Sequence, residues 1–208
     1  MRMNRWLLLP LLTLTLSAPA KADEALAQFH AFFDQLTAMQ AGFLQTVTDA
    51  RGRILEEAEG EIAVQQPGRF RLAYRQPHQQ LYIADGEQLW TYDGELAQAS
   101  VRPQDEALDD TPALLLSAPE RIGERFALID LGPFEGFQWL ELEPYHRDGD
   151  FERVLLAFRD GQLLVMDMAD QFGQFTRLEF LGLQRNPELD AELFTFDPPP
   201  GTDILGLE

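Results

Sequence analysis

The stretch from Gly60 to Tyr92 reads GEIAVQQPGRFRLAYRQPHQQLYIADGEQLWTY, and it predicts three strands in succession with turns between them. At its centre Phe70, Leu72 and Tyr74 alternate with residues that include two arginines, the period-two pattern of a half-buried strand. One face of this strand is aromatic and apolar, and the other carries guanidinium groups on long apolar stems. The pattern indicates a sheet that offers an apolar face to another element or a ligand.

The first 22 residues have the pattern of a secretory signal peptide. Arg2 and Arg5 give a basic start, Trp6–Leu16 is a short apolar run, and Ala20-Lys21-Ala22 is a small-x-small cleavage site. The apolar run is shorter than the ~20 residues that a membrane span needs, which disfavours a retained anchor. We expect cleavage of residues 1–22, with cleavage after Ala20 as the alternative, and a soluble exported protein.

Composition limits both the stabilising forces and the partners. The chain has 208 residues, enough for a substantial core, and it contains no cysteine. It can therefore form no disulfide and cannot itself be acylated on an N-terminal cysteine. The 16 basic and 35 acidic residues give a net charge of −19, which argues against nucleic acid or anionic surfaces as partners. A solubility shell explains this charge better than a dedicated acidic docking face.

The chain after the leader begins with a predicted helix, Asp23–Met39, on which apolar residues recur every three or four positions. A strand over 41–50 and another over 54–65 follow, before the rest of the opening stretch. The strand pattern then breaks between 97 and 126. There Thr111 is a suitable N-cap, Pro112 suits the first helical position, and a short apolar helix runs to Ser117.

A second run of strands follows this helical insert. Four Asp-Gly pairs mark turns, since Asp-Gly readily adopts the positive φ angles of a type I′ hairpin. These pairs begin at Asp85, Asp93, Asp148 and Asp160. The expected strands of the second run are 126–131, 137–143, 151–159, 163–169, 175–184 and 193–197.

Consecutive hairpins predict a mostly antiparallel sheet, and about ten strands in one sheet should curl or close. Several strands are apolar on both faces, so part of the sheet is covered on both sides or encloses a cavity. No repeat or low-complexity linker divides residues 23–208, which we therefore expect to form a single domain.

The sequence has few residue patterns that are typical of catalysis. The chain has no cysteine nucleophile, and its three histidines, His30, His78 and His146, have no metal-ligand spacing. Two serines beyond the leader lie outside any G-x-S-x-G motif, and Glu141 with Glu143 are better explained as exposed acidic residues than as a glycosidase pair. We therefore expect neither an enzyme nor a metal or cofactor.

The order of these features resembles the periplasmic outer-membrane lipoprotein carriers of the Lol pathway. Each motif is weak alone, but their order and spacing over nearly the whole mature chain are specific. The motifs are FLQTVTD at 43–49, GEI at 60–62, QPGRFRLAY at 66–74, DGEQLWTY at 85–92, TPALLL at 111–116 and FTFDPPPGTD at 194–203.

The resemblance implies a mainly β fold with a helical lid: an unclosed antiparallel β-barrel of about ten or eleven strands, with helices over its concave apolar face. It implies a monomeric chaperone that takes acylated lipoproteins from an inner-membrane ABC transporter and hands them to an outer-membrane receptor. The cavity would shield the acyl chains in transit, because each exposed CH₂ group costs about 0.8 kcal/mol in water.

The resemblance also implies site residues. Lid-helix candidates are Leu26, Phe29, Phe33 and Leu36. Candidates for the acyl-binding surface are Phe43, Val47, Phe70, Leu72, Tyr74, Trp90, Leu114, Leu115 and Trp139. Many family members carry an arginine before the proline of the QPGRF-like motif, which is thought to hold the lid closed; here that residue is Gln66, and Arg69 and Arg71 are the substitute candidates. An amide gives weaker hydrogen bonds than a guanidinium, which predicts a looser lid or a latch elsewhere.

Three other hypotheses about the function remain open from the sequence. One is a lipocalin-like carrier of a free hydrophobic ligand, although the early Gly-x-Trp signature of lipocalins is missing. The second is an extracytoplasmic hydrolase, and the third is a sheet scaffold with an ordinary filled core.

Overall fold

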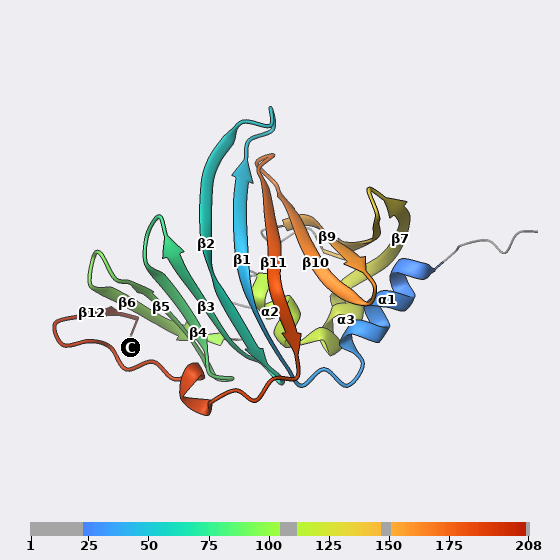
Figure 1. The fold of residues 1–208 in the computed structure, drawn as a ribbon. Helices are drawn as coiled ribbons and strands as arrows, with labels where there is room; N and C mark the ends of the chain where they lie inside the picture. The colour runs from blue at the N-terminus through green and yellow to red at the C-terminus, as the bar shows by residue number, and fades with distance from the viewer. Residues whose placement is uncertain (1–22, 105–111, 147–150, 207–208) are drawn as a thin grey trace, which may run out of the picture.

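The computed structural model describes residues 23–104, 112–146 and 151–206, with side chains not described at 112–114. Its main feature is one curved sheet of twelve strands in the order β12-β6-β5-β4-β3-β2-β1-β11-β10-β9-β8-β7 (Figure 1). Among the described strands β12 and β7 form the two edges, so the sheet is open, as expected. All neighbours are antiparallel except β12, which is parallel to β6.

Helices lie over the concave side of this sheet (Figure 1). Helix α1, Glu24–Phe33, packs against β7 to β10, and α2, Pro112–Ser117, packs against β2 and β3. The remaining elements are β1 (Ala38–Thr48), β2 (Ile54–Gln65), β3 (Arg69–Gln76), β4 (Gln80–Ala84), β5 (Gln88–Asp93), β6 (Gln98–Pro103), η2 (Pro119–Arg121), α3 (Ile122–Arg125), β7 (Phe126–Phe134), β8 (Phe137–Pro144), β9 (Phe151–Arg159), β10 (Gln162–Asp170), β11 (Phe175–Arg185), η3 (Ala191–Phe194) and β12 (Asp203–Leu205).

The Asp-Gly turns differ from one another. Asp160 and Gly161 both have positive φ angles and join β9 to β10, as a type I′ turn requires. Asp85 and Asp93 also begin connections between paired strands, but these loops are longer, and each carboxylate accepts hydrogen bonds from backbone N–H groups two and three residues later. The type I′ prediction is therefore wrong for these two. The pair beginning at Asp148 lies outside the described residues.

Three features differ from the sequence prediction. The first helix ends at Phe33 rather than Met39, because Gln35 takes a positive φ and the chain then enters β1 at Ala38. The expected strand at 193–197 is wrong: Ala191–Phe194 is a 3₁₀ helix whose N-cap, Asp190, accepts a hydrogen bond from the Glu192 N–H. Strands β6 and β12 were not predicted, which brings the number from ten or eleven to twelve.

Each face of the sheet has its own cover. The concave face carries most of the core, in which residues of the sheet pack against residues of all three α-helices. On the convex face, the segment after β11 runs back beneath the sheet to the far edge, where it ends as β12 (Figure 1). Phe196 of this segment lies against the rings of Trp90 and Tyr92, with centroids 5.5 and 5.3 Å apart. The convex face at β4 to β6 is therefore covered by the C-terminal segment.

Candidate functional site

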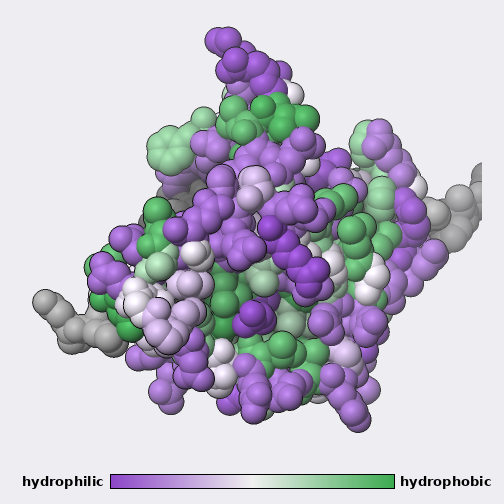
Figure 2. Space-filling model, turned by 60° about the vertical axis from the view of Figure 1, so that its left-hand side comes forward, coloured by the Kyte–Doolittle hydropathy of each residue, from purple (hydrophilic) through white to green (hydrophobic). Residues whose placement is uncertain are grey.

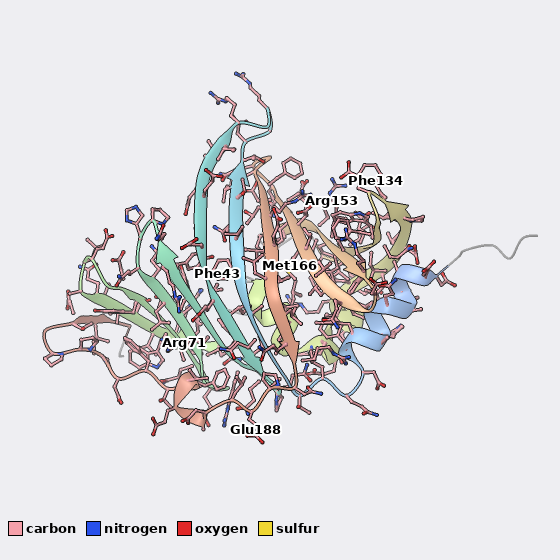
Figure 3. The ribbon with its side chains drawn as sticks, viewed as in Figure 1. Phe43, Arg71, Phe134, Arg153, Met166 and Glu188 are labelled. Atoms are coloured by element: carbon pink, nitrogen blue, oxygen red, sulfur yellow. The ribbon has the colours of Figure 1, made fainter. Side chains whose placement is uncertain are left out.

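The candidate site is the concave face together with its lid, which we define as α1 and the segment 112–125 that contains α2, η2 and α3. Sheet residues Phe43, Phe70 and Leu72 are buried on this face, and Tyr74 and Leu115 pack against them. Phe43 and Met166 come from the central strands β1 and β10 (Figure 3). The structure thus brings five of the acyl-binding candidates into one apolar cluster.

The four lid candidates join the same cluster from above. Phe29 and Leu36 are buried, and Leu26 and Phe33 are partly buried against it. Leu36 lies beyond the end of α1, so it belongs to the connection to β1 rather than to the helix. Phe32, which is not among the lid candidates, is fully buried. The lid and the sheet therefore share one apolar interface.

An aromatic row crosses the concave face beside the lid. The rings of Phe43 and Tyr74 meet edge to face at 5.2 Å, and those of Tyr74 and Tyr82 at 6.1 Å. Burial raises the pKa of Tyr74, so the phenol stays protonated and donates a hydrogen bond of 2.8 Å to Gln45 Oε1. The hydroxyl is thereby satisfied within an otherwise apolar surface.

Gly60 makes room for this row. It is the cross-strand partner of Phe43 on one side and Tyr74 on the other. A Cβ atom at this position would lie 2.6 Å from Phe43 Cζ and against the carbonyl oxygen of Ala73. The glycine is therefore required for the Phe43 ring to lie across β2.

The other acyl-binding candidates are not in the cluster. The strand alternation of β1 places Val47 on the same face as Phe43 but nearer the β1–β2 tip, where it is half-buried. Trp90 lies on the convex face against Phe196, and Trp139 donates its indole N–H to the carbonyl of Phe134 at 3.1 Å. Leu114 lies outside the described side chains.

The arginine candidates for the lid latch point away from the lid. Arg69 donates to the carbonyl of Asp85, and Arg71 reaches the carbonyl of Leu193 on the convex side. Partial burial lowers the pKa of Arg71 from its usual value. In the described part of the chain, the hydrogen bonds of these two arginines go to these carbonyls and not to the lid.

Gln66 does reach the lid. It lines a crevice of about 680 Å³ between α1 and the η2–α3 segment, together with Phe33, Asp34 and Pro119. Its Nε2 atom is buried without a hydrogen-bond partner among the described residues. An unsatisfied amide at this position means that Gln66 does not fasten the lid by a side-chain hydrogen bond.

Polar contacts that the sequence did not predict hold α1 at both ends. The Asp130 carboxylate of β7 accepts hydrogen bonds from the Ala25 and Leu26 N–H groups at 2.8 and 3.3 Å, which places a negative charge at the helix N-terminus. At the other end Arg185 donates to the carbonyl of Asp34 at 2.9 Å and lies over the ring of Phe32.

The second part of the lid is held at the turn before β3. The Gly68 N–H donates to the carbonyl of Ser117 at the end of α2, at 3.1 Å. Gln104 is buried and joins this turn to the next one, since it donates to the Gly68 carbonyl and accepts from the Gly86 N–H. The two parts of the lid are thus attached to different regions of the sheet.

The described residues contain no group of three or more His, Cys, Asp or Glu side chains that could hold a metal ion. They also contain no helix that is long and apolar enough to cross a membrane. Hydrophilic side chains dominate the face in Figure 2, with hydrophobic patches between them.

Comparison with known proteins gives a consistent assignment. The model of the family described as outer membrane lipoprotein carrier protein LolA matches residues 34–197. The outer-membrane lipoprotein carrier protein of Nitrosospira multiformis is 41% identical over 175 residues, 84% of each chain. That of Methylococcus capsulatus is 35% identical over 199 residues, covering 96% of this chain and 95% of the relative.

Solved structures with low sequence identity share the fold of this chain, and they support the fold alone. An uncharacterized conserved protein from Thermus thermophilus superposes with a TM-score of 0.55 at 15% identity, covering 88% of this chain and 98% of that one. A LolA superfamily protein from Nitrosomonas europaea gives a TM-score of 0.50 at 14% identity, covering 84% and 97%. With the family model and these relatives matching most of its length, the chain belongs to the LolA family of outer-membrane lipoprotein carrier proteins.

Proposed function

We propose that this protein is a periplasmic chaperone that shields the acyl chains of lipoproteins in the space between its concave sheet face and its lid. The observation that carries the proposal is the shared apolar interface, one core cluster that contains Phe43, Phe70 and Leu72 of the sheet together with Phe29 and Phe32 of α1. Membership of a family of lipoprotein carriers supports it. Carriers of this kind bind and release their cargo rather than transform it.

The energetics suit reversible shielding. Each buried CH₂ group of an acyl chain contributes about 0.8 kcal/mol, so one long chain contributes on the order of 10 kcal/mol. The lid residues that the chain displaces contribute about 1.5–3 kcal/mol each when fully buried. Acyl chains can therefore replace the lid against the sheet, and the lid can return when the cargo leaves.

The route of the cargo follows from the family resemblance. We infer that residues 1–22 are a cleaved signal peptide and that residues 23–208 form one carrier domain in the periplasm. An inner-membrane ABC transporter would load the lipoprotein, since the periplasm itself has no ATP, and an outer-membrane receptor would accept it. No cofactor is needed for either step.

A binding measurement tests the proposal. The purified protein is titrated with a synthetic diacylated lipopeptide that carries a fluorophore, and the probe is then displaced by an unlabelled copy or by free fatty acid of the same length. Displacement by the lipopeptide at far lower concentration than by the fatty acid supports the carrier. Stronger displacement by the fatty acid would favour the lipocalin-like alternative, and failure to bind either would contradict both.

Gln66→Arg should strengthen the closed lid. A guanidinium at this position would reach the crevice beside Asp34, where the amide of Gln66 has no partner among the described residues. We expect lipopeptide association to slow by roughly tenfold or more, because a hydrogen bond with a charged donor contributes about 1.5–3 kcal/mol. Stopped-flow fluorescence measures this rate, and Gln65→Arg is the control because strand alternation turns residue 65 to the other face. Equal rates for Gln66→Arg and the parent protein would contradict the prediction.

A further inference from the structure

The concave face changes in polarity from its centre toward β6. Cross-strand neighbours form one row that begins with Phe43 on β1, Gly60 on β2 and Tyr74 on β3, and continues with Gln80 on β4 and Asp93 on β5. The first three positions are the aromatic part of the candidate site. The last two are an amide and a carboxylate, so the row passes from apolar to polar.

The adjacent row makes the same change. Leu72 on β3 neighbours Tyr82 on β4, which neighbours Thr91 on β5 and then Ser100 on β6. The Thr91 and Ser100 hydroxyls are hydrogen-bonded to each other, and Leu205 of β12 lies beyond them. The helices of the lid pack on β2, β3 and β7 to β10, which leaves this polar end beside them.

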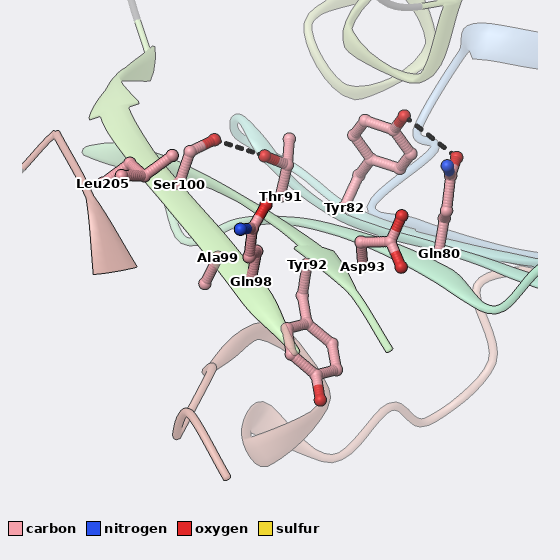
Figure 4. Close-up of a pocket in the computed structure, with 9 residues that line it drawn as sticks. All are labelled: Gln80, Tyr82, Thr91, Tyr92, Asp93, Gln98, Ala99, Ser100 and Leu205. Atoms are coloured by element: carbon pink, nitrogen blue, oxygen red, sulfur yellow. Dashed lines mark hydrogen bonds between the residues drawn. The ribbon is translucent and has the colours of Figure 1, made fainter. Parts of the chain in front are cut away.

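A pocket of about 230 Å³ lies at this polar end (Figure 4). Gln80, Tyr82, Thr91, Asp93 and Ser100 line it, and Tyr82 also packs against the apolar cluster. The pocket is therefore continuous with the candidate acyl-binding surface through one side chain. Its polar groups are amides, hydroxyls and a carboxylate.

Its charge is negative. The residues that line the pocket include Asp93 and, in the described structure, no lysine, arginine or histidine. Asp93 Oδ1 accepts hydrogen bonds from the Glu95 and Leu96 N–H groups, which fixes the carboxylate beside the pocket. The negative charge of Asp93 affects the other groups of the pocket. The pKa of Tyr82 is raised first by burial and second by the charge of Asp93.

We propose that this pocket receives the uncharged or cationic polar group that joins the acyl chains to the cargo polypeptide, and that it disfavours the anionic phosphate of a phospholipid. Strands lie about 4.8 Å apart, so the path from Phe43 on β1 to Asp93 on β5 is roughly 19 Å. An acyl chain spans half of the ~30 Å bilayer core, about 15 Å, and therefore fits between the two. The inference rests on the proposed carrier function and assigns its selectivity.

The selectivity matters because phospholipids carry the same acyl chains. An apolar cavity alone cannot distinguish them from a lipoprotein, since both gain the same burial energy. A carboxylate near the head group repels a phosphate while it tolerates an ester, an amide or an ammonium group.

A single added charge tests the inference. Gln98 lines the pocket, is exposed and neighbours Asp93 on β5, so Gln98→Lys places an ammonium beside the carboxylate without disturbing the core. Gln88→Lys makes the same change at an exposed position of β5 outside the pocket. Asp93→Asn removes the negative charge and keeps an oxygen for the turn.

The measurement is competition between phosphatidylglycerol and a diacylated lipopeptide with matched chains and a net-neutral peptide. We expect the parent protein to prefer the lipopeptide, and Gln98→Lys to reduce that preference roughly fivefold to tenfold, as a unit charge within a few ångströms would. Asp93→Asn should reduce it by a similar factor, because it changes the charge of the pocket by the same one unit, and Gln88→Lys should leave it unchanged.

Two results would overturn the inference while the carrier function stands. One is a parent protein that binds both lipids equally, and the other is an equal effect of Gln98→Lys and Gln88→Lys. A parent protein that does not bind the lipopeptide would overturn the carrier function, and the selectivity with it.

Discussion

Gly60→Ala is expected to lower the free energy of unfolding by about 3 kcal/mol, at the upper end of what overpacking a core costs. The new methyl group would lie 2.6 Å from Phe43 Cζ and against the Ala73 carbonyl oxygen. A side chain can turn aside, but the carbonyl belongs to the β2–β3 ladder and moves only if the strands separate. Urea denaturation measures the change as a lower midpoint at constant m-value.

Gly123→Ala is the matched control. Gly123 lies on α3, is exposed, and has open space where its Cβ would be. Alanine is the better helix former, so the control should be neutral or slightly stabilising. Equal midpoints for the two variants would show that β2 does not pass close beneath Phe43.

A second substitution separates the two contacts at Gly60. Phe43→Leu shortens the side chain and removes the ring atoms that the methyl group would meet. In the double variant we expect part of the loss at Gly60 to be recovered, because the ring contact no longer adds to the carbonyl contact. Strict additivity would assign the whole effect to the backbone.

The strand alternation predicted the sheet well but could not say which face turns inward. In QLWTYD the apolar pattern favours Trp90 and Tyr92, and Trp90 was accordingly a candidate for the acyl-binding surface. The structure turns Leu89 to the concave side, and Trp90 packs under Phe196, a residue more than 100 positions later. Only the path of the C-terminal segment decides between the faces, and local periodicity does not contain that path.

Burial leaves no room for a charged side chain at Phe70. Phe70 is 0% exposed in the closed structure, in a cluster with Leu116 of α2. A carboxylate there would be buried unpaired and would force the lid open or unfold the sheet.

The contacts that attach the lid could not be predicted from the sequence for a related reason. The resemblance predicted a latch at the turn before β3, where the family arginine is replaced by Gln66. The contacts that hold α1 join residues about 105 and 151 positions apart, Asp130 with Ala25 and Arg185 with Asp34. Such pairs follow from the curvature of the open sheet around the helix, so no local motif predicts them.

Removing both attachments is expected to detach α1 from the sheet. The variant is Asp130→Ala combined with Arg185→Met, which keeps an apolar stem near Phe32. Loss of a side-chain cap costs about 1 kcal/mol, and loss of a hydrogen bond with a charged donor costs a similar amount at this exposed site. Together they amount to about 2 kcal/mol, so the open lid should become roughly 30-fold more populated.

Hydrogen exchange measures this opening directly. The amides of α1 should exchange roughly 30-fold faster, while those of β1 and β11 in the centre of the sheet should keep their protection. Asp170→Ala is the control, because Asp170 caps a turn through the Phe172 and Gln174 N–H groups and is far from α1 in its contacts. If the central strands also lose protection, the double variant has weakened the whole fold and not the lid.

The sign of the effect on binding follows from linkage. Acyl chains replace the lid against the sheet, so the closed lid competes with them, and any change that weakens the closed state makes cargo binding tighter. The double variant should therefore bind a diacylated lipopeptide more tightly and associate faster, opposite to the effect of Gln66→Arg. Its transfer to an acceptor vesicle should slow, because a lid that gains less by closing expels the cargo less readily. Unchanged affinity together with faster α1 exchange would mean that acyl chains bind without displacing this helix.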